Sequence, residues 1–332
     1  MTALPPTMTA IEISTPGGPE VLLPVVRPTP QPGPGEVIIK VVAAGVNRPD
    51  VFQRQGNYAP PPGASDLPGL EIAGTVVAVG FGAQHIDVGD QVCALVAGGG
   101  YAEYCAAPAA QCLPIPSGLS FEEAAAIPET FFTVYTNLVE RAQFKFGDTV
   151  LIHGGTSGIG VAAIQMAAAL GGKVFATAGS YDKAHFCETL GATRGINYKL
   201  EDFVELVKAG TGGRGVDIIL DMVGGDYVQR NIACAAIDGR IVNIAFLHGA
   251  RVEVDLNQVM RKRLTLTGST LRPRSVEEKG AIAQELRRRI WPLIERGAIK
   301  PVVYKTFPLA EAAEAHRLMA SSEHIGKIIL TI

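Results

Sequence analysis

Short apolar runs separated by glycine and proline dominate the first 125 residues of the chain. The segments EVIIKVVAAGV (36–46) and EIAGTVVAVG (71–80) are rich in β-branched residues, and a polar, proline-rich stretch (47–69) lies between them. Strands of this length, cut by turn residues at short intervals, are typical of antiparallel sheets and barrels. The pattern therefore predicts a barrel-like β domain in residues 8–125.

The pattern changes near Phe121. Residues 121–144 have helical spacing, with acidic residues in the first turn and Pro128 as an interruption. From residue 149 to about residue 268, apolar runs alternate with helical segments, and several runs are continuously apolar, as in strands covered on both faces. This alternation predicts a doubly wound parallel sheet of the Rossmann type, so the fold class is α/β. The remaining residues add two helical segments and end on the strand GKIILTI.

The stretch LIHGGTSGIG (151–160) joins the first of these strands to a helix through a glycine turn. The unpaired N–H groups and the dipole at such a helix start attract phosphate, and glycine lets the backbone approach it. In this context the glycines predict a dinucleotide site. Ser157 stands where the usual fingerprint has its second glycine, and its hydroxyl can either bind the cofactor or only cap the helix.

Two other enzyme classes have glycine-rich motifs with a similar sequence. The short-chain dehydrogenase loop needs a Tyr-x-x-x-Lys pair for catalysis, but residues such as Tyr181 and Tyr198 are followed at the fourth position by His185 and Asp202. A serine-hydrolase elbow needs G-x-S-x-G, and Ile159 occupies the last position. Both interpretations are therefore disfavoured.

The end of the second strand of the predicted parallel sheet indicates which dinucleotide is bound. An NAD site usually has Asp or Glu there to bind the ribose 2′-hydroxyl, but this chain has Ala178, Gly179 and Ser180. Ser180 and Lys183 are suited to a 2′-phosphate, which needs donors and positive charge, although Lys183 also fits an ordinary exposed helix position. The missing acid favours NADPH.

The composition restricts the partners and the cellular compartment that we expect for this chain. The net charge of −3 argues against nucleic-acid binding, and the basic runs 261–263 and 287–289 are expected to be solvated. The five cysteines form no C-x-x-C motif, which fits a reduced, cytoplasmic chain. We find no signal peptide pattern and no apolar run of the roughly 18 residues that a membrane helix needs, so no membrane partner is expected.

Eight stretches together resemble one enzyme family. They are GVNRPDVFQRQGNYAPPPGAS, PGLEIAGTV, GGGYAEY, AAAIPETFFTVY, HGGTSGIGVAAIQ, AGSYDK, LDMVGG and GKIILTI. The chain resembles the zinc-independent NADPH:quinone oxidoreductases, the zeta-crystallin-like branch of the medium-chain dehydrogenase/reductases, and within it the stress-inducible type. The resemblance implies a GroES-like β-barrel substrate domain (8–126 with 270–332), a Rossmann NADPH-binding domain (127–269) and an N-terminal extension (1–7).

The resemblance also implies an enzyme without metal. Zinc-dependent relatives bind the catalytic ion through a cysteine where this chain has Asn47, and through a His-Glu pair where it has Leu70-Glu71. The four-cysteine structural zinc lobe is missing as well. Without a Lewis acid to stabilise an alkoxide, simple alcohol oxidation is disfavoured, and quinones or activated enones are the expected acceptors.

The resemblance assigns catalytic roles to Asn47, near the nicotinamide and its ribose, and to Tyr58, whose hydroxyl can bind the acceptor carbonyl. Tyr58 also fits a loop tyrosine that packs on the neighbouring prolines, and the proton is expected from Tyr58 or water. The remaining cofactor residues are Thr133 at the nicotinamide, Gly155, Thr156, Ser157, Gly158 and Ile159 at the pyrophosphate, Ser180, Lys183 and Tyr198 at the 2′-phosphate, Phe246 and Leu247 at the carboxamide, and Leu271, Arg272 and Lys327, which return to the cofactor. Lys327 also fits a common lysine at the start of a terminal strand.

Two features depart from the family's pattern. AFLHGA (245–250) replaces a smaller, glycine-rich loop, and Asp182 next to Lys183 would weaken phosphate selectivity if it faced the site. Enoyl-thioester reduction, and an NADPH-binding protein without turnover that is crystallin-like or RNA-binding, stay open as alternatives. The apolar segment RLTLTGSTL (263–271) lies where sheets of two copies pair in this family, so a homodimer is expected.

Overall fold

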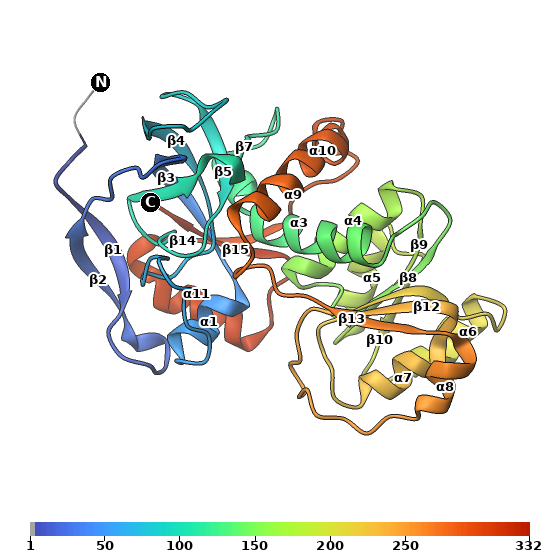
Figure 1. The fold of residues 1–332 in the computed structure, drawn as a ribbon. Coiled ribbons are helices and arrows are strands. Elements are labelled where there is room, and N and C mark those ends of the chain that lie inside the picture. The colour runs from blue at the N-terminus through green and yellow to red at the C-terminus, as the bar shows by residue number, and fades with distance from the viewer. Residues whose placement is uncertain (1–3) are drawn as a thin grey trace. The chain divides into compact units, whose positions relative to one another are not determined.

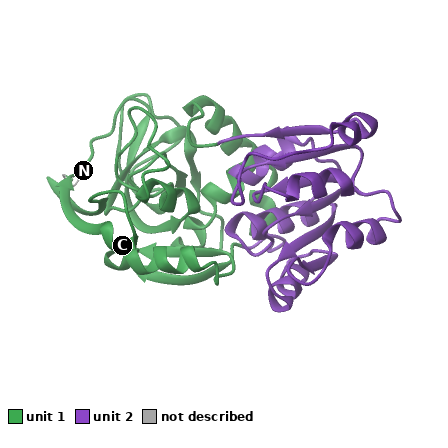
Figure 2. Cartoon of the chain, turned by 90° about the horizontal axis from the view of Figure 1, so that it is seen from below, with its two compact units in different colours: residues 1–132, 271–295, 301–332 green, residues 133–270, 296–300 purple. Residues whose placement is uncertain are grey.

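The computed structural model describes residues 4–332, so the first three residues of the expected N-terminal extension lie outside the described part. The chain divides into two compact units (Figures 1 and 2). Unit 1, green in Figure 2, comprises residues 1–132, 271–295 and 301–332, and unit 2, purple, comprises residues 133–270 and 296–300.

Unit 1 is built on a mixed seven-stranded sheet in the order β14-β15-β3-β4-β5-β7, with β6 also paired to β3. Its strands are β3 (Glu36–Val46), β4 (Glu71–Val79), β5 (Gln91–Leu95), β6 (Tyr104–Pro108), β7 (Cys112–Pro114), β14 (Val303–Pro308) and β15 (Lys327–Thr331). A separate antiparallel pair contains β1 (Thr7–Ile13) and β2 (Leu22–Pro28). Apolar side chains of both ends of the chain, such as Val37, Ile72 and Ile328, share one core.

The pairing of β15 with β3 determines where the site of unit 1 forms. Ile328 lies opposite Val46, so the start of the terminal strand lies beside the end of β3. Gly74 of β4 allows the close approach of β3, because a Cβ atom there would overlap the carbonyl oxygen of Lys40. Residues 328–331 are therefore fixed against residues 43–46 by backbone pairing, which places Lys327 beside the end of β3.

The helices of unit 1 include one that the polar, proline-rich pattern of residues 47–69 did not indicate. α1 (Arg48–Arg54) begins at Asn47, where Asn47 and Asp50 form a capping box and a proline occupies the first turn. The other helical segments of this unit are η1 (Pro19–Val21), η2 (Ala109–Gln111), α2 (Phe121–Ala125), α9 (Val276–Arg289), α10 (Trp291–Glu295), η4 (Leu309–Glu311) and α11 (Ala312–Ser321). α3 (Pro128–Val134) begins in unit 1 and ends in unit 2.

Unit 2 contains a six-stranded sheet in the order β10-β9-β8-β11-β12-β13, in which every pair is parallel. This is the strand order 3-2-1-4-5-6 of a Rossmann fold, so the predicted α/β class is confirmed. The strands are β8 (Thr149–Ile152), β9 (Lys173–Ala178), β10 (Arg194–Asn197), β11 (Val216–Asp221), β12 (Ala235–Asn243) and β13 (Thr265–Gly268). The helices are α4 (Gly158–Ala169), α5 (Tyr181–Thr189), α6 (Phe203–Gly210), α7 (Tyr227–Cys234) and α8 (Leu256–Lys262).

The interruption expected at Pro128 is present, because residues 121–144 divide into α2, then α3, which begins at Pro128, and then a π-helix, η3 (Tyr135–Arg141). One expectation needs correction. The basic run 261–263 is not simply solvated, since the Lys262 ammonium donates to the carbonyl oxygens of Ile232, Ala233 and Ala235 at 2.8, 2.9 and 3.1 Å and so caps the end of α7. No helix within residues 4–332 has both the length and the apolar character required to cross a membrane.

Candidate functional site

The glycine loop of unit 2 joins β8 to α4, and two of its glycines, Gly154 and Gly160, cannot be replaced by a larger residue without strain. Gly154 has a φ of 67°, and a Cβ atom at Gly160 would overlap the carbonyl oxygen of Gly154. Ser157 is the N-cap of α4, and its Oγ accepts from the Gly160 N–H at 2.9 Å. The helix-capping alternative for Ser157 is thus present, and its contact with a cofactor stays a prediction.

A buried polar network that the sequence did not reveal contains His153, the residue immediately before this loop. His153 is fully buried, with Nε2 2.7 Å from Asn231 Oδ1 and Nδ1 3.0 Å from Thr177 Oγ1. Asn231 in turn donates to Asp221 Oδ2 at 3.1 Å. Burial lowers the pKa of His153, so the ring is neutral, and the network fixes the backbone that enters the glycine turn.

The predicted 2′-phosphate residues lie together at the end of β9. Ser180 is the N-cap of α5 and accepts from the Lys183 N–H at 3.2 Å. A Cβ atom built at Gly179 would lie 3.3 Å from the Tyr198 hydroxyl and 3.7 Å from Lys199 Cε, so both side chains pass beside this turn. Lys199 is an exposed cation that the sequence analysis missed, and Asp182 is exposed as well.

The residues expected at the nicotinamide end of unit 2 are accessible. Phe246 and Leu247 follow β12 and are 48% and 47% exposed. Thr133 is partly exposed, and its carbonyl oxygen accepts from Asn137 Nδ2 at 2.8 Å at the start of η3. The contacts of these side chains with a cofactor stay predictions.

In unit 1, Asn47 and Lys327 form a buried cluster with Glu71. The Lys327 ammonium lies 2.6 Å from Asn47 Oδ1, 2.6 Å from Glu71 Oε1 and 3.0 Å from the carbonyl oxygen of Val46. Asn47 Nδ2 also donates to Glu71 Oε1 at 2.9 Å. Gly45 makes room for the carboxylate, since a Cβ atom there would overlap Glu71 Oε1. Sequence reasoning kept Glu71 only as the remnant of a zinc motif and missed this role.

This Asn47–Glu71–Lys327 cluster does not fit a zinc ion. Its oxygen atoms already surround an ammonium group, and it offers no thiolate or imidazole ligand. Within residues 4–332, no group of three or more His, Cys, Asp or Glu side chains is arranged to hold a metal ion.

Asp50 lies beside the cluster on α1. Its carboxylate accepts from the N–H groups of Asn47 (2.8 Å) and Gly69 (3.2 Å) and from the Tyr101 hydroxyl (3.2 Å). Burial raises the pKa of Asp50 to about 6, and these hydrogen bonds oppose a larger rise. The Asn-x-x-Asp spacing of a capping box was visible in the sequence and was a signal for this residue.

Glu129 is a further residue that sequence reasoning missed. It lies in the first turn of α3, and its N–H donates to Glu71 Oε2 at 2.8 Å. Burial and, after it, the charge of Glu71 raise the pKa of Glu129 to about 8. The carboxyl group is only partly exposed and accepts no hydrogen bond from residues 4–332.

Tyr58 is held by Arg272. The guanidinium lies 5.3 Å from the centre of the Tyr58 ring, and Nη1 donates to the Tyr58 carbonyl oxygen at 3.5 Å. The same guanidinium donates to Ala97 O at 2.7 and 2.9 Å and to Gln53 Oε1 at 2.8 Å. Arg272 and Leu271 are 6% and 7% exposed, so Arg272 mainly fixes the loop that carries Tyr58, and burial raises the pKa of the Tyr58 phenol.

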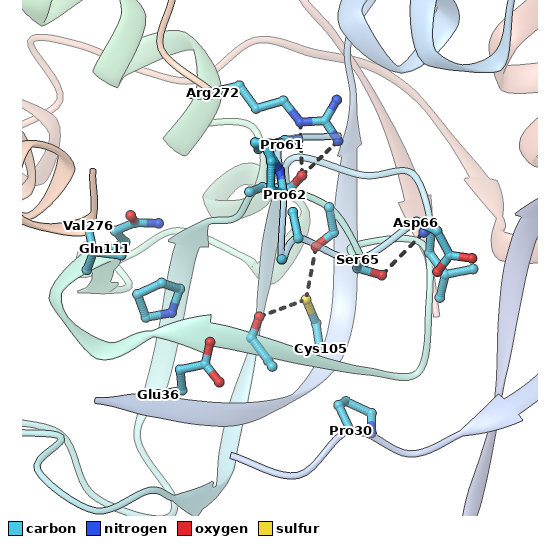
Figure 3. A pocket seen from close by; sticks show the side chains of 18 of the residues that line it. Pro30, Glu36, Pro61, Pro62, Ser65, Asp66, Cys105, Gln111, Arg272 and Val276 are labelled. Carbon is cyan, nitrogen blue, oxygen red and sulfur yellow. Dashed lines mark hydrogen bonds between the residues drawn. The ribbon is translucent and has the colours of Figure 1, made fainter. Parts of the chain in front are cut away.

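A pocket of about 650 Å³ lies elsewhere in unit 1 (Figure 3). Its walls come from the proline-rich segment 61–67, from residues 272–276 and from side chains that include Cys105 and Gln111. Arg272 is the one predicted site residue in its lining, and Asn47, Tyr58 and Lys327 are absent from it. We therefore place the candidate site at the Asn47–Glu71–Lys327 cluster rather than in this pocket.

Two family models match parts of this chain. Residues 33–117 match the family model described as alcohol dehydrogenase GroES-like domain, and residues 190–330 match the one described as zinc-binding dehydrogenase. The quinone oxidoreductase of Rattus norvegicus is 34% identical over 98% of each chain. A mycocerosic acid synthase-like polyketide synthase of Mycobacterium tuberculosis is 33% identical over 97% of this chain but only 15% of its own length.

Solved structures extend this likeness to three dimensions. The structure of Escherichia coli quinone oxidoreductase complexed with NADPH is 34% identical and covers 98% of this chain and 100% of its own, with a TM-score of 0.87. Both the sequence and the fold are therefore similar over nearly the whole chain. The chain belongs to the quinone oxidoreductase family of the medium-chain dehydrogenase/reductases.

Proposed function

We propose that the protein is an NADPH-dependent oxidoreductase that reduces quinones and other activated conjugated carbonyls without zinc. The observation that carries the proposal is the Asn47–Glu71–Lys327 cluster, in which an ammonium group stands among the oxygen atoms that a metal would need. A site of this kind has no Lewis acid for alcohol oxidation, whereas a conjugated carbonyl is electrophilic without one. The family membership and the NADPH in the related E. coli structure support the same conclusion.

The residues of unit 2 fit a phosphorylated dinucleotide. The backbone from Gly155 to Ile159 would hold the pyrophosphate at the start of α4, with Thr156, Ser157 and Gly158 between them. Ser180, Lys183 and Tyr198 would hold the 2′-phosphate, and Lys199 adds positive charge there. Thr133, Phe246 and Leu247 would contact the nicotinamide end. For Asn47, Leu271, Arg272 and Lys327 of unit 1, cofactor contact is likewise proposed.

When bound, NADPH supplies a hydride to the acceptor. The protein's part is orientation: Tyr58 would hold the acceptor carbonyl through its hydroxyl, and Asn47 would be fixed in place by Glu71 and Lys327. Arg272 keeps the Tyr58 loop from moving away, because four of its hydrogen bonds join separate segments of unit 1.

The function is tested by following NADPH consumption with a small panel of quinones, with NADH and an enoyl thioester run beside them. We expect turnover with NADPH and a 1,4-quinone, and much slower turnover with NADH. Consumption with the enoyl thioester alone would instead support enoyl reduction, the second candidate, which the similarity to a segment of a polyketide synthase favours. No turnover with any acceptor would refute an enzymatic role.

Replacing Tyr58 by phenylalanine is expected to lower kcat/KM for quinones by about tenfold, because one hydrogen bond to the acceptor oxygen is lost in the transition state. Steady-state kinetics at fixed NADPH measure this loss. Tyr104→Phe is the matched control, since this partly exposed tyrosine lies on β6, away from the cluster. Unchanged turnover in Tyr58→Phe would exclude Tyr58 from catalysis.

We also propose a cytoplasmic homodimer of the zeta-crystallin-like branch, paired through β13. β13 is the edge strand of the unit 2 sheet, and Leu266 on it and Leu256 and Met260 on the neighbouring α8 are 41%, 66% and 70% exposed. All five cysteines are free thiols, as a reducing compartment requires. Light scattering should give twice the 34.9 kDa chain mass for the wild type and a smaller value for Leu266→Lys. A monomeric wild type would contradict the proposed dimer.

A further inference from the structure

Three acidic residues of unit 1 feel the charge of the Lys327 ammonium, and one of them binds it. Glu71 binds the ammonium directly, Asp50 is held by the Asn47 backbone, and Glu129 is joined to Glu71 through its own N–H. The other charged or titratable groups that act on Glu129 are Arg272 and Lys279, which carry positive charge, and Tyr58. Glu71 alone of the three forms an ion pair with the ammonium, and the charge of Lys327 also opposes the rise in the pKa of Asp50 and of Glu129.

The hydrogen bonds distinguish these acids. Glu71 accepts from the Lys327 ammonium, from Asn47 Nδ2 and from the Glu129 N–H, all of which favour a carboxylate. Asp50 accepts from two backbone N–H groups and one hydroxyl, which likewise favour a carboxylate. Each of these two acids is thus satisfied as an anion.

Glu129 has no such support. Within residues 4–332 its carboxyl group accepts no hydrogen bond and makes no ion pair. The backbone N–H of Glu129 donates to Glu71 and not to its own carboxyl group. Glu129 is partly buried, so ionisation would place a second, poorly solvated negative charge near the Glu71 carboxylate. The pKa of Glu129 is accordingly raised to about 8, because the positive charges of Lys327 and Lys279 only partly offset burial and the repulsion from Glu71. Glu129 therefore holds a proton at neutral pH.

Glu129 also lies near the group expected to hold the acceptor. The pKa of the Tyr58 phenol is raised by burial and, after it, by the charge of Glu129, while Arg272 opposes the rise. The Tyr58 phenol thus keeps its proton more strongly than usual, which makes it a hydrogen-bond donor to an acceptor oxygen but a poor acid. The Glu129 carboxylic acid, whose charge acts on this phenol, is the better proton source at neutral pH.

We propose that Glu129 is the proton donor of the site and that its carboxylic acid protonates the oxygen of the reduced quinone or enone. The step rests on the proposed function. The acceptor gains a hydride from NADPH, which becomes NADP⁺, and the resulting oxyanion takes the proton as the Glu129 O–H bond breaks and a new O–H bond forms. The Glu129 carboxylate then recovers a proton from water, to which its partly exposed side chain has access.

The first test is the pH dependence of kcat/KM in Glu129→Gln. The wild type is expected to lose activity as the pH rises through about 8, because the acid is then ionised. Glu129→Gln should be slower at neutral pH by a factor on the order of 10² and should lack this falling limb. Glu122→Gln, on the neighbouring α2, is the matched control and should keep the wild-type profile.

The second test needs neither cofactor nor substrate. A carboxyl whose pKa rises from 4.5 to about 8 on folding stabilises the protein fully below the unfolded value, and this contribution is lost as the pH rises through the folded value. Glu129→Gln should therefore unfold at the same temperature as the wild type in acid. It should unfold at a higher temperature above about pH 8.

The outcomes separate the two proposals. A wild type that reduces quinones, together with a Glu129→Gln variant that keeps its rate and falling limb, would overturn the proton donor and leave the proposed function intact. An unfolding-temperature difference independent of pH would overturn the protonated state of Glu129. A wild type that reduces no quinone would overturn the proposed function first, whatever the unfolding temperatures are.

Discussion

Replacing Lys327 by methionine is expected to destabilise the protein by about 3–5 kcal/mol. The substitution keeps the length of the side chain but leaves the Glu71 carboxylate buried without its ion pair, with side-chain exposures of 4% for Lys327 and 0% for Glu71. Asn47 would lose its 2.6 Å bond to the ammonium as well. Urea unfolding of the purified variant, followed by circular dichroism, measures the change in the free energy of unfolding.

Two further variants make this prediction specific. Lys40→Met, at an exposed lysine of β3, should change the free energy of unfolding by less than about 0.5 kcal/mol. Adding Glu71→Gln to Lys327→Met should restore part of the lost stability, because no buried charge is then left unpaired. A Lys327→Met variant as stable as wild type would show that the Asn47–Glu71–Lys327 cluster is not held by the ammonium.

Replacing Ser180 by aspartate is expected to lower the preference for NADPH over NADH by about 100-fold. A carboxylate there repels the 2′-phosphate and removes a donor to it, and a lost charge-assisted hydrogen bond of about 3 kcal/mol corresponds to that factor. The helix should survive, because aspartate caps a helix N-terminus as well as serine does. The ratio of kcat/KM for the two cofactors, with one quinone held constant, measures the effect.

The structure offers a matched control for this variant. Ser275 caps α9 in unit 1, where its Oγ accepts from the Glu278 N–H at 3.2 Å, as Ser180 Oγ accepts from Lys183 at the same distance. Ser275→Asp makes the same chemical change away from the end of β9 and should leave the cofactor ratio unchanged. An unchanged ratio in Ser180→Asp would place the 2′-phosphate elsewhere.

The parallel sheet of unit 2 was predictable because its signals are local. Strands such as β8 and β11 are mostly apolar runs, and each strand from β8 to β12 is followed by a helix before the next strand, so these strands could be placed without knowledge of their partners. The glycine loop was predictable for the same reason, since Gly154 and Gly160 are needed by the turn itself. Helix α1 was missed, although Asn47 and Asp50 carried its capping signal.

Local sequence patterns could not predict the Asn47–Glu71–Lys327 cluster of unit 1. Asn47 and Lys327 are 280 residues apart in the sequence, and only the pairing of β15 with β3 brings them together. Glu129 has the pattern of an ordinary acidic residue in a first helical turn. Its partial burial beside Glu71 depends on where α3 lies against β4, which no spacing along the chain reveals.

The most direct test of metal-free NADPH:quinone chemistry is the initial rate of NADPH oxidation with a 1,4-quinone after the protein has been treated with a strong chelator and dialysed. We expect the full rate of the untreated protein, with no bound zinc by elemental analysis. Loss of the rate on chelation, with recovery on addition of zinc, would contradict it.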